Sequence, residues 1–161
     1  MKIHLIRHAK ADSTSDSGKD FDRKLSPKGI VQVNVLAHFL NDLKIKPEII
    51  LCSSATRTWE TLSIIQHKIS LGKITYFEDL YLCDREIYLS KIWELKNNKE
   101  LLIVGHNDGI SSLATYLSDE PFMMKTGEYT CIEFKADSWQ EVSRGTGRVI
   151  AQFRPSVFLP D

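Results

Sequence analysis

The chain has 161 residues, enough for one domain with a sizeable core, and 42% of them are hydrophobic. Lys and Arg together number 21, as do Asp and Glu, so the formal net charge is zero. No overall basic field would attract nucleic acid or an acidic membrane. We therefore expect a single domain over residues 1–161 with neither as a partner.

The chain shows none of the patterns of secretion or membrane insertion. Its first residues carry charge and lack the apolar segment of a signal peptide. No apolar run approaches the ~18 residues needed to span a bilayer. Its three cysteines, odd in number and far apart, show no metal-ligand or redox spacing. We expect a cytoplasmic protein with reduced thiols; the sequence does not predict its oligomeric state.

The first half of the chain begins with a strand and a long polar loop. The predicted strand Lys2–Arg7 is apolar before it ends at Arg7 and His8. The loop Asp12–Lys24 follows, and a loop of that length after a strand is often functional. Ser26 and Pro27 then mark the beginning of a helix. Apolar residues recur in it at helical spacing: Ile30, Val33, Ala37, Leu40 and Leu43.

The rest of the chain alternates between strands and helices. The pattern predicts strands at 48–53, 73–77, 100–106, 129–134 and 148–153, and helices at 55–71, 88–95 and 110–117. Trp59 and Trp93 are placed on the core stripes of two helices. Pro155 and Pro160 argue against a regular element in the tail. The alternation predicts a three-layer α/β fold, with a mainly parallel sheet covered by helices on both faces.

Arginine and histidine side chains follow three of the predicted strands. Arg7 and His8 end the first, Arg57 lies just past the second, and His106 ends the strand 100–106. Ligands bind at the carboxyl ends of parallel strands, so we expect these four side chains at one rim. Two arginines match the paired oxygens of a phosphate dianion, and a histidine beside a cation is biased toward its neutral, nucleophilic form. The set favours phosphoryl transfer through a phosphorylated histidine, without a metal or cofactor.

Three motifs resemble those of the histidine phosphatase superfamily, which includes the phosphoglycerate mutases. They are Arg7-His8 at a strand end, "SSATRTWET" around Arg57, and "LLIVGHN" around His106. The stretches "RHAKAD", "DRKLSPKG" and "KTGEYTCIEF" resemble the branch of phosphohistidine phosphatases typified by SixA. The resemblance covers nearly the whole chain and implies a phosphoglycerate mutase-like fold.

The resemblance implies a role for each site residue. His8 would attack phosphorus and carry the phosphoryl group, while Arg7 and Arg57 would hold phosphate oxygens. His106 would donate to the phosphate and stabilise the transition state, and Arg23 in "DRKLSPKG" would add a phosphate contact. The substrate would be phosphohistidine on a protein, such as a histidine phosphotransfer domain. Alternatives are a small phosphomonoester as substrate, or a phosphate- or phosphoprotein-binding module without turnover.

A general acid is not evident in the sequence. Many superfamily members place a carboxylate after the third strand, where this chain offers four without a motif to choose among them: Glu78, Asp79, Asp84 and Glu86. A protonated imidazole departs easily from phosphorus, whereas an alkoxide gains more from a placed acid. The weak acid signal therefore favours phosphohistidine as the substrate.

Other candidate residues have simpler interpretations. "CSSATR" has four residues between Cys52 and Arg57 where a cysteine-phosphatase loop needs five, so we expect a buried thiol. His4 is expected in or behind the core, and His38 and His67 at the surface. Four aspartates in the polar loop lack the spacing of a calcium-binding loop: Asp12, Asp16, Asp20 and Asp22. The loop is predicted to be a solvated cover over the pocket.

Overall fold

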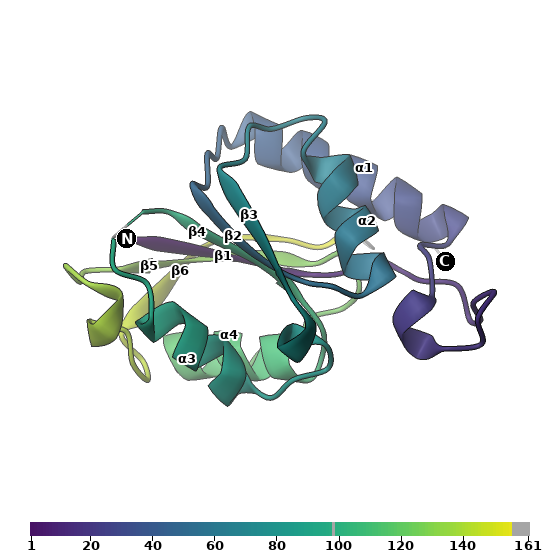
Figure 1. The fold of residues 1–161 in the computed structure, drawn as a ribbon. Helices are drawn as coiled ribbons and strands as arrows, with labels where there is room; N and C mark the ends of the chain where they lie inside the picture. Colours follow the sequence, from purple (N-terminus) through teal and green to yellow (C-terminus); the bar gives the residue numbers. More distant parts are fainter. Residues whose placement is uncertain (98, 156–161) are drawn as a thin grey trace.

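The computed structural model describes residues 1–97 and 99–155. It contains a six-stranded sheet in the order β3-β2-β4-β1-β5-β6 (Figure 1). The strands are β1 (Lys2–Arg7), β2 (Ile49–Ser53), β3 (Lys73–Phe77), β4 (Leu101–Gly105), β5 (Tyr129–Phe134) and β6 (Gly147–Phe153). Strands β3, β2, β4 and β1 run parallel, whereas β5 is antiparallel to both β1 and β6. The predicted mainly parallel sheet is confirmed.

Two pairs of helices cover the two faces of the sheet (Figure 1). The helices are α1 (Pro27–Asp42), α2 (Thr56–Ile65), α3 (Arg85–Trp93) and α4 (Gly109–Ser118). Ile6 of β1 belongs to the apolar cluster that contains Leu36 of α1 and Leu62 of α2. Its neighbour Leu5 points to the other face and belongs to the cluster with Leu113 of α4. This alternation builds the predicted three layers.

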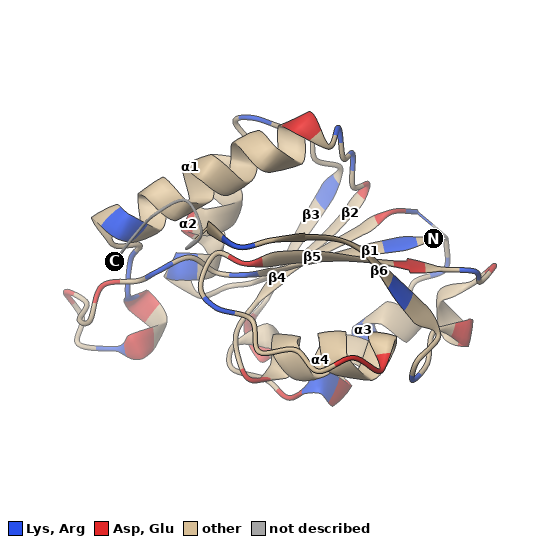
Figure 2. Cartoon of the chain, turned by 180° about the vertical axis from the view of Figure 1, so that it is seen from behind, with Lys and Arg blue, Asp and Glu red and all other residues tan. Residues whose placement is uncertain are grey.

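Charged residues occur in the loops, in the strands and along the helices (Figure 2). In that view acidic and basic residues are interspersed, and the sequence contains equal numbers of the two kinds. Within the described residues, no helix combines the length and apolar character that crossing a membrane would require. Pro160, on which part of the tail prediction rests, lies outside the described residues.

The prediction that Trp59 and Trp93 lie in the core is wrong. Trp59 is 49% exposed and Trp93 is 40% exposed, although the indole of Trp93 donates to Val142 O. In α2 the inward face instead carries polar residues, among them Arg57 and Thr58. The buried face of α2 supplies polar side chains to the strand ends. It therefore differs from the most hydrophobic face, which was the one predicted to be buried. The helix also ends at Ile65, short of its predicted end.

The first helix departs from its predicted stripe for a related reason. Ile30 is 44% exposed, and Gly29 and Gln32 are buried in its place. A Cβ at position 29 would lie 2.0 Å from Lys10 O, so only glycine allows the helix to approach the segment after β1 so closely. The Gln32 side chain accepts a hydrogen bond from Lys10 N at 2.9 Å. Close approach to the chain beyond β1 therefore decides which face is buried. Leu43, which follows α1, is also exposed.

Candidate active site

Three neighbouring strand ends bring the predicted site residues together. In the sheet, β4 lies between β1 and β2, and Arg7 of β1 pairs with Gly105 of β4. His8 and His106 follow these two strands, and their ring centroids are 5.1 Å apart. Arg57 reaches His8 from the first turn of α2. We refer to His8, His106, Arg57 and Arg7 as the cradle.

His8 is held in one tautomer by its two hydrogen-bond partners. Its Nδ1 lies 2.8 Å from the carbonyl oxygen of Ala9, which can only accept, so Nδ1 donates. Its Nε2 lies 3.2 Å from Nε of Arg57, which can only donate, so Nε2 accepts. Nε2 therefore carries the lone pair of a neutral imidazole and is the nitrogen that can attack an electrophile.

Burial and neighbouring cations keep both histidines neutral. Removal from water is the main cause that lowers the pKa of His8 to about 3, and Arg57 and Arg7 act in the same direction. Burial, followed by the effects of His8 and Arg57, lowers the pKa of His106 to about 2. Both imidazoles are therefore uncharged at neutral pH, and His8 retains the lone pair on Nε2.

These lowered pKa values predict how stability depends on pH. In the unfolded chain a histidine titrates near pH 6.5, so between about pH 6.5 and 3 the unfolded state binds more protons than the folded state. The contribution of these neutral histidines to the free energy of unfolding is complete above pH 6.5. It is lost as the pH falls through this window, and the free energy of unfolding then falls by up to about 1.4 kcal/mol per pH unit for each histidine.

The His8→Asn variant is expected to show a shallower fall in unfolding free energy with decreasing pH than the parent protein. Urea unfolding between pH 7.5 and 4.5 measures both slopes. The matched control is His38→Asn, which removes an exposed histidine on α1. Equal slopes in His8→Asn and the parent would contradict the pKa assignment of His8.

His106 presents one ring nitrogen to Ser53 and leaves the other without a partner. Its Nε2 lies 2.8 Å from Ser53 Oγ, which also accepts a hydrogen bond from Ala55 N at 3.3 Å. In the tautomer in which the Ser53 hydroxyl donates to Nε2, the ring proton lies on Nδ1. Nδ1 is buried and has no hydrogen-bond partner among the described residues. An anion that accepted from Nδ1 would remove the cost of this unsatisfied group.

Gly105 allows the strand end that carries His106 to pack against Tyr88. A Cβ at position 105 would lie 2.0 Å from the Tyr88 hydroxyl oxygen, and Tyr88 is fully buried. This hydroxyl accepts a hydrogen bond from the backbone N–H of His106 at 3.2 Å. We expect Gly105→Ala to lower the unfolding free energy by about 1–3 kcal/mol through overpacking. Urea denaturation measures the loss, and an unchanged midpoint would contradict it.

Arg7 lies at the cradle with its guanidinium half-buried. Its Nη1 donates to Met124 O at 2.8 Å, the oxygen that also accepts from Asn107 Nδ2. Its Nε is buried and has no hydrogen-bond partner among the described residues. Burial lowers the pKa of Arg7, with Asp108 and Glu128 acting in the opposite direction, but a guanidinium stays protonated. Arg7 therefore supplies positive charge and an unused donor.

The structure adds two side chains that the sequence did not identify, Asp20 and Tyr81. Arg57 donates from Nη1 to Asp20 O at 2.8 Å and from Nη2 to Asp20 Oδ2 at 3.0 Å. The Tyr81 hydroxyl donates to the same Oδ2, and the Tyr81 ring meets His106 edge-on at 5.5 Å. Asp20 therefore bonds directly to the cradle from the loop that we predicted to be a solvated cover over the pocket. No regular spacing links Asp20 to Tyr81, and only the fold brings them together.

Arg23 lies beside the cradle but is bonded to the loop. It donates from Nε to Asp20 Oδ1 at 2.8 Å and from Nη1 to Asp12 O at 2.7 Å. Its positive charge still acts to lower the pKa of His8. Arg23 thus contributes charge to the site, and Asp20 stands between it and Arg57.

The four carboxylates considered as general acids are all exposed. Among the described residues, none of them bonds to a cradle side chain. Asp79 pairs with Lys91 at 2.8 Å, and Glu86 pairs with Arg85 at 2.6 Å. The other two candidates are Glu78 and Asp84.

Cys52 is fully buried, as predicted, and burial raises the pKa of its thiol. It therefore stays protonated and is a poor nucleophile. His4 is also buried as predicted, between Tyr129 and Glu100, and His38 and His67 are exposed.

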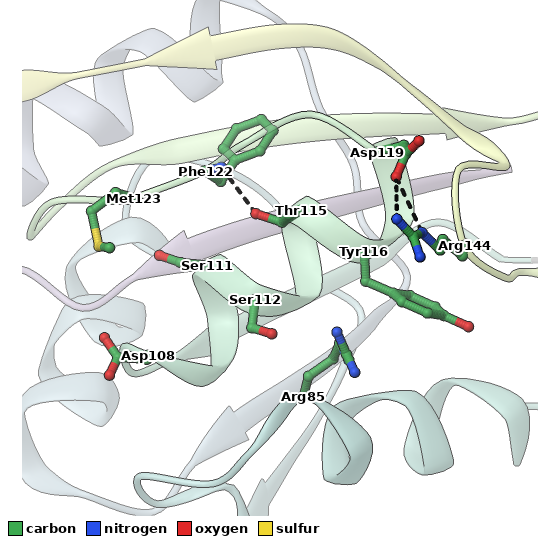
Figure 3. A pocket seen from close by; sticks show the side chains of 10 residues that line it. All are labelled: Arg85, Asp108, Ser111, Ser112, Thr115, Tyr116, Asp119, Phe122, Met123 and Arg144. Carbon is green, nitrogen blue, oxygen red and sulfur yellow. Dashed lines mark hydrogen bonds and ion pairs between the residues drawn. The ribbon is translucent and has the colours of Figure 1, made fainter.

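A separate groove of about 600 Å³ runs along α4 (Figure 3). It begins at Asp108, close to His106 in the chain, and reaches Asp119, which pairs with Arg144 at 3.2 Å. The Arg85 guanidinium lies over the Tyr116 ring at 4.8 Å along one wall. No cradle side chain lines this groove among the described residues, so the reactive groups and the groove are distinct features.

The donor set of the cradle suits an anion. In the part of the chain that the structure describes, no three His, Cys, Asp or Glu side chains are grouped to hold a metal ion. The cradle instead combines two guanidiniums, two neutral imidazoles and unpartnered donors. Guanidiniums match the oxygens of a tetrahedral phosphate in charge and in geometry.

Comparison with known proteins identifies the family. The model of the histidine phosphatase superfamily (branch 1) matches residues 3–85, which include Arg7, His8 and Arg57. The chain belongs to the histidine phosphatase superfamily. An uncharacterized protein from Mycobacterium leprae is 31% identical over 117 residues, covering 70% of this chain and 71% of that protein.

Solved structures of SixA proteins share the fold of this chain. SixA from Nakamurella multipartitia is similar with a TM-score of 0.84 and 22% identity, over 96% of this chain and 95% of that chain. A protein histidine phosphatase SixA complexed with tungstate gives a TM-score of 0.83 and 21% identity, over 98% of this chain and 99% of that chain. The likeness concerns the fold, and it confirms the predicted phosphoglycerate mutase-like architecture.

Proposed function

We propose that this protein is a metal-independent phosphatase that works through a phosphohistidine intermediate on His8. The observation that supports this proposal most strongly is that His8 is neutral and its Nε2 lone pair faces the buried guanidinium of Arg57. Arg57 and His106 are 2% and 0% exposed, and both lie next to His8. A nucleophile beside fixed cations is the arrangement that in-line phosphoryl transfer requires.

The reaction would proceed in two displacements. In the first, the hydrogen bond from Arg57 Nε to His8 Nε2 is released and the Nε2 lone pair forms a bond to phosphorus. The bond from phosphorus to the leaving group breaks, and its electron pair departs with that group. In the second, water attacks phosphorus, the bond to Nε2 breaks, and its electron pair returns to His8. The water gives up a proton to solvent, and inorganic phosphate leaves. Arg7, Arg57 and His106 Nδ1 would hold the phosphoryl oxygens throughout.

We further propose phosphohistidine on a protein, such as a histidine phosphotransfer domain, as the substrate. The candidate acids at 78, 79, 84 and 86 do not bond to the cradle, so an alkoxide leaving group would lack a placed proton donor. Imidazole departs without one when its other nitrogen is protonated. The SixA relatives in fold are phosphohistidine phosphatases by name, and one was solved with the oxyanion tungstate.

The test compares substrates in the presence of excess chelator. We expect hydrolysis of a phosphohistidine peptide and of p-nitrophenyl phosphate, with acid-labile phosphate on the protein during turnover, detected by mass spectrometry. A phosphoserine peptide of the same sequence should react much more slowly. Comparable hydrolysis of the phosphoserine peptide would favour a phosphomonoesterase. Tight binding of phosphate without hydrolysis would favour a binding module.

A further inference from the structure

Asp20 is a carboxylate built into a site that otherwise carries positive charge. It begins a short 3₁₀ turn, Asp20–Asp22, inside the polar loop. Its Oδ1 accepts from Arg23 Nε, and its Oδ2 accepts from Arg57 Nη2 and from the Tyr81 hydroxyl. One donor from its own turn and two from distant chain segments thus fix the position of this side chain. Such a network exceeds what an exposed loop residue needs for its own solvation.

Burial shows that Asp20 lies at the mouth of the cradle. His8, Arg57 and His106 are 7%, 2% and 0% exposed and form its floor. The Asp20 side chain is 45% exposed, although it bonds to Arg57. A group attacked in line by His8 from the floor must depart on the opposite side of phosphorus, toward the mouth. Because Asp20 bonds to Arg57 and is more exposed than the floor residues, it is a candidate neighbour of the departing group.

The charge of Asp20 restricts what it can do there. Its hydrogen bond from Tyr81, together with those from Arg23 and Arg57, lowers its pKa to about 2, so it is ionised at neutral pH. An ionised carboxylate cannot protonate an alkoxide. It repels a leaving group that gathers negative charge, and it accepts a hydrogen bond from a cationic N–H. Asp20 thus favours a leaving group that carries a proton of its own.

We propose that Asp20 is a specificity-determining residue that selects N-phosphoimidazole over phosphomonoesters by accepting a hydrogen bond from the leaving imidazole. This inference rests on the proposed function. The substrate ring is protonated on the nitrogen remote from phosphorus, and that N–H bonds to Asp20. When His8 Nε2 bonds to phosphorus, the P–N bond of the substrate breaks and its electron pair neutralises the ring. The imidazole then leaves uncharged, and its remote nitrogen keeps the proton that forms the hydrogen bond to Asp20.

The test is the ratio of two activities in Asp20→Asn, an isosteric change without charge. We expect kcat/KM for a phosphohistidine peptide to fall roughly ten- to a hundredfold more than kcat/KM for p-nitrophenyl phosphate, because one charge-assisted hydrogen bond is lost. The pH profile for phosphohistidine should also shift to lower pH, since the carboxylate no longer favours ring protonation. Asp20→Glu, which keeps the charge, should restore part of the ratio.

The matched control is Asp22→Asn in the same turn, where the carboxylate accepts from Ser17 Oγ at 2.5 Å and does not touch the cradle. Its activity ratio and its pH profile should equal those of the parent protein. An equal loss for both substrates in Asp20→Asn would overturn the specificity role, even with normal activity in the parent. Failure of the parent protein to hydrolyse phosphohistidine would instead overturn the proposed function.

Discussion

His8→Ala is expected to abolish phosphatase activity, with kcat for p-nitrophenyl phosphate reduced by roughly 10⁴-fold or more, a loss typical of removing a covalent nucleophile. Its Nε2 is the lone-pair nitrogen that faces the Arg57 guanidinium in the cradle, at 3.2 Å. The other cradle imidazole, His106, turns its Nε2 toward Ser53. Alanine at position 8 removes the nucleophile while leaving the arginines that hold an oxyanion.

Two measurements separate this role from a structural one. Acid-labile phosphate should disappear from His8→Ala in a rapid-quench experiment, while tungstate binding by calorimetry persists within about tenfold of the parent, since Arg7 and Arg57 remain. The control is His38→Ala, which removes an exposed histidine of α1 and should leave both readouts unchanged. Persistent turnover with phosphate on another residue, or turnover at the parent rate, would refute the assignment.

The sequence could predict the cradle because each of its members lies at the end of a strand or shortly after it. A strand that ends in Arg7-His8 and another that ends in Gly105-His106 are local features, and parallel pairing brings their ends together. Predicting Arg57 as a site residue required one further inference, because Arg57 lies in the first turn of the helix that follows a strand and not in the strand itself. The same rule that places ligands at the carboxyl ends of strands therefore accounts for all four residues.

The residues that the sequence did not reveal depend on contacts between distant segments. Asp20 was one of four aspartates in a polar loop, and nothing in the local pattern distinguished it from Asp22. Only the folded chain brings it to Arg57 and Tyr81. The exposed Trp59 has the converse explanation. A hydrophobic stripe predicts the buried face of a helix only where the fold does not need polar side chains on that face. In α2 the buried face carries Arg57, which bonds to the site, and Trp59 is left exposed.

Arg57→Lys is expected to lower kcat/KM for p-nitrophenyl phosphate by roughly 10²- to 10³-fold, although it keeps the positive charge. Arg57 uses three nitrogens at once: Nε bonds to His8, and both terminal nitrogens bond to Asp20. A lysine ammonium is a single point on a flexible stem and cannot orient the imidazole and hold a phosphoryl oxygen together. Because Arg57 is only 2% exposed, water cannot reach this position to replace the missing hydrogen-bond donors.

The expected loss in Arg57→Lys divides between binding and chemistry in a way that can be measured. Weaker tungstate binding reports the lost oxyanion contacts, and a lower rate of phosphoenzyme formation in single turnovers reports the disturbed His8. The matched control is Arg85→Lys, which changes an arginine of α3 that pairs with Glu86 and lines the separate groove; its kcat/KM should stay within about twofold. If Arg57→Lys retained the parent kcat/KM, charge alone would explain the site and the directional bond to Nε2 would have no role in the reaction.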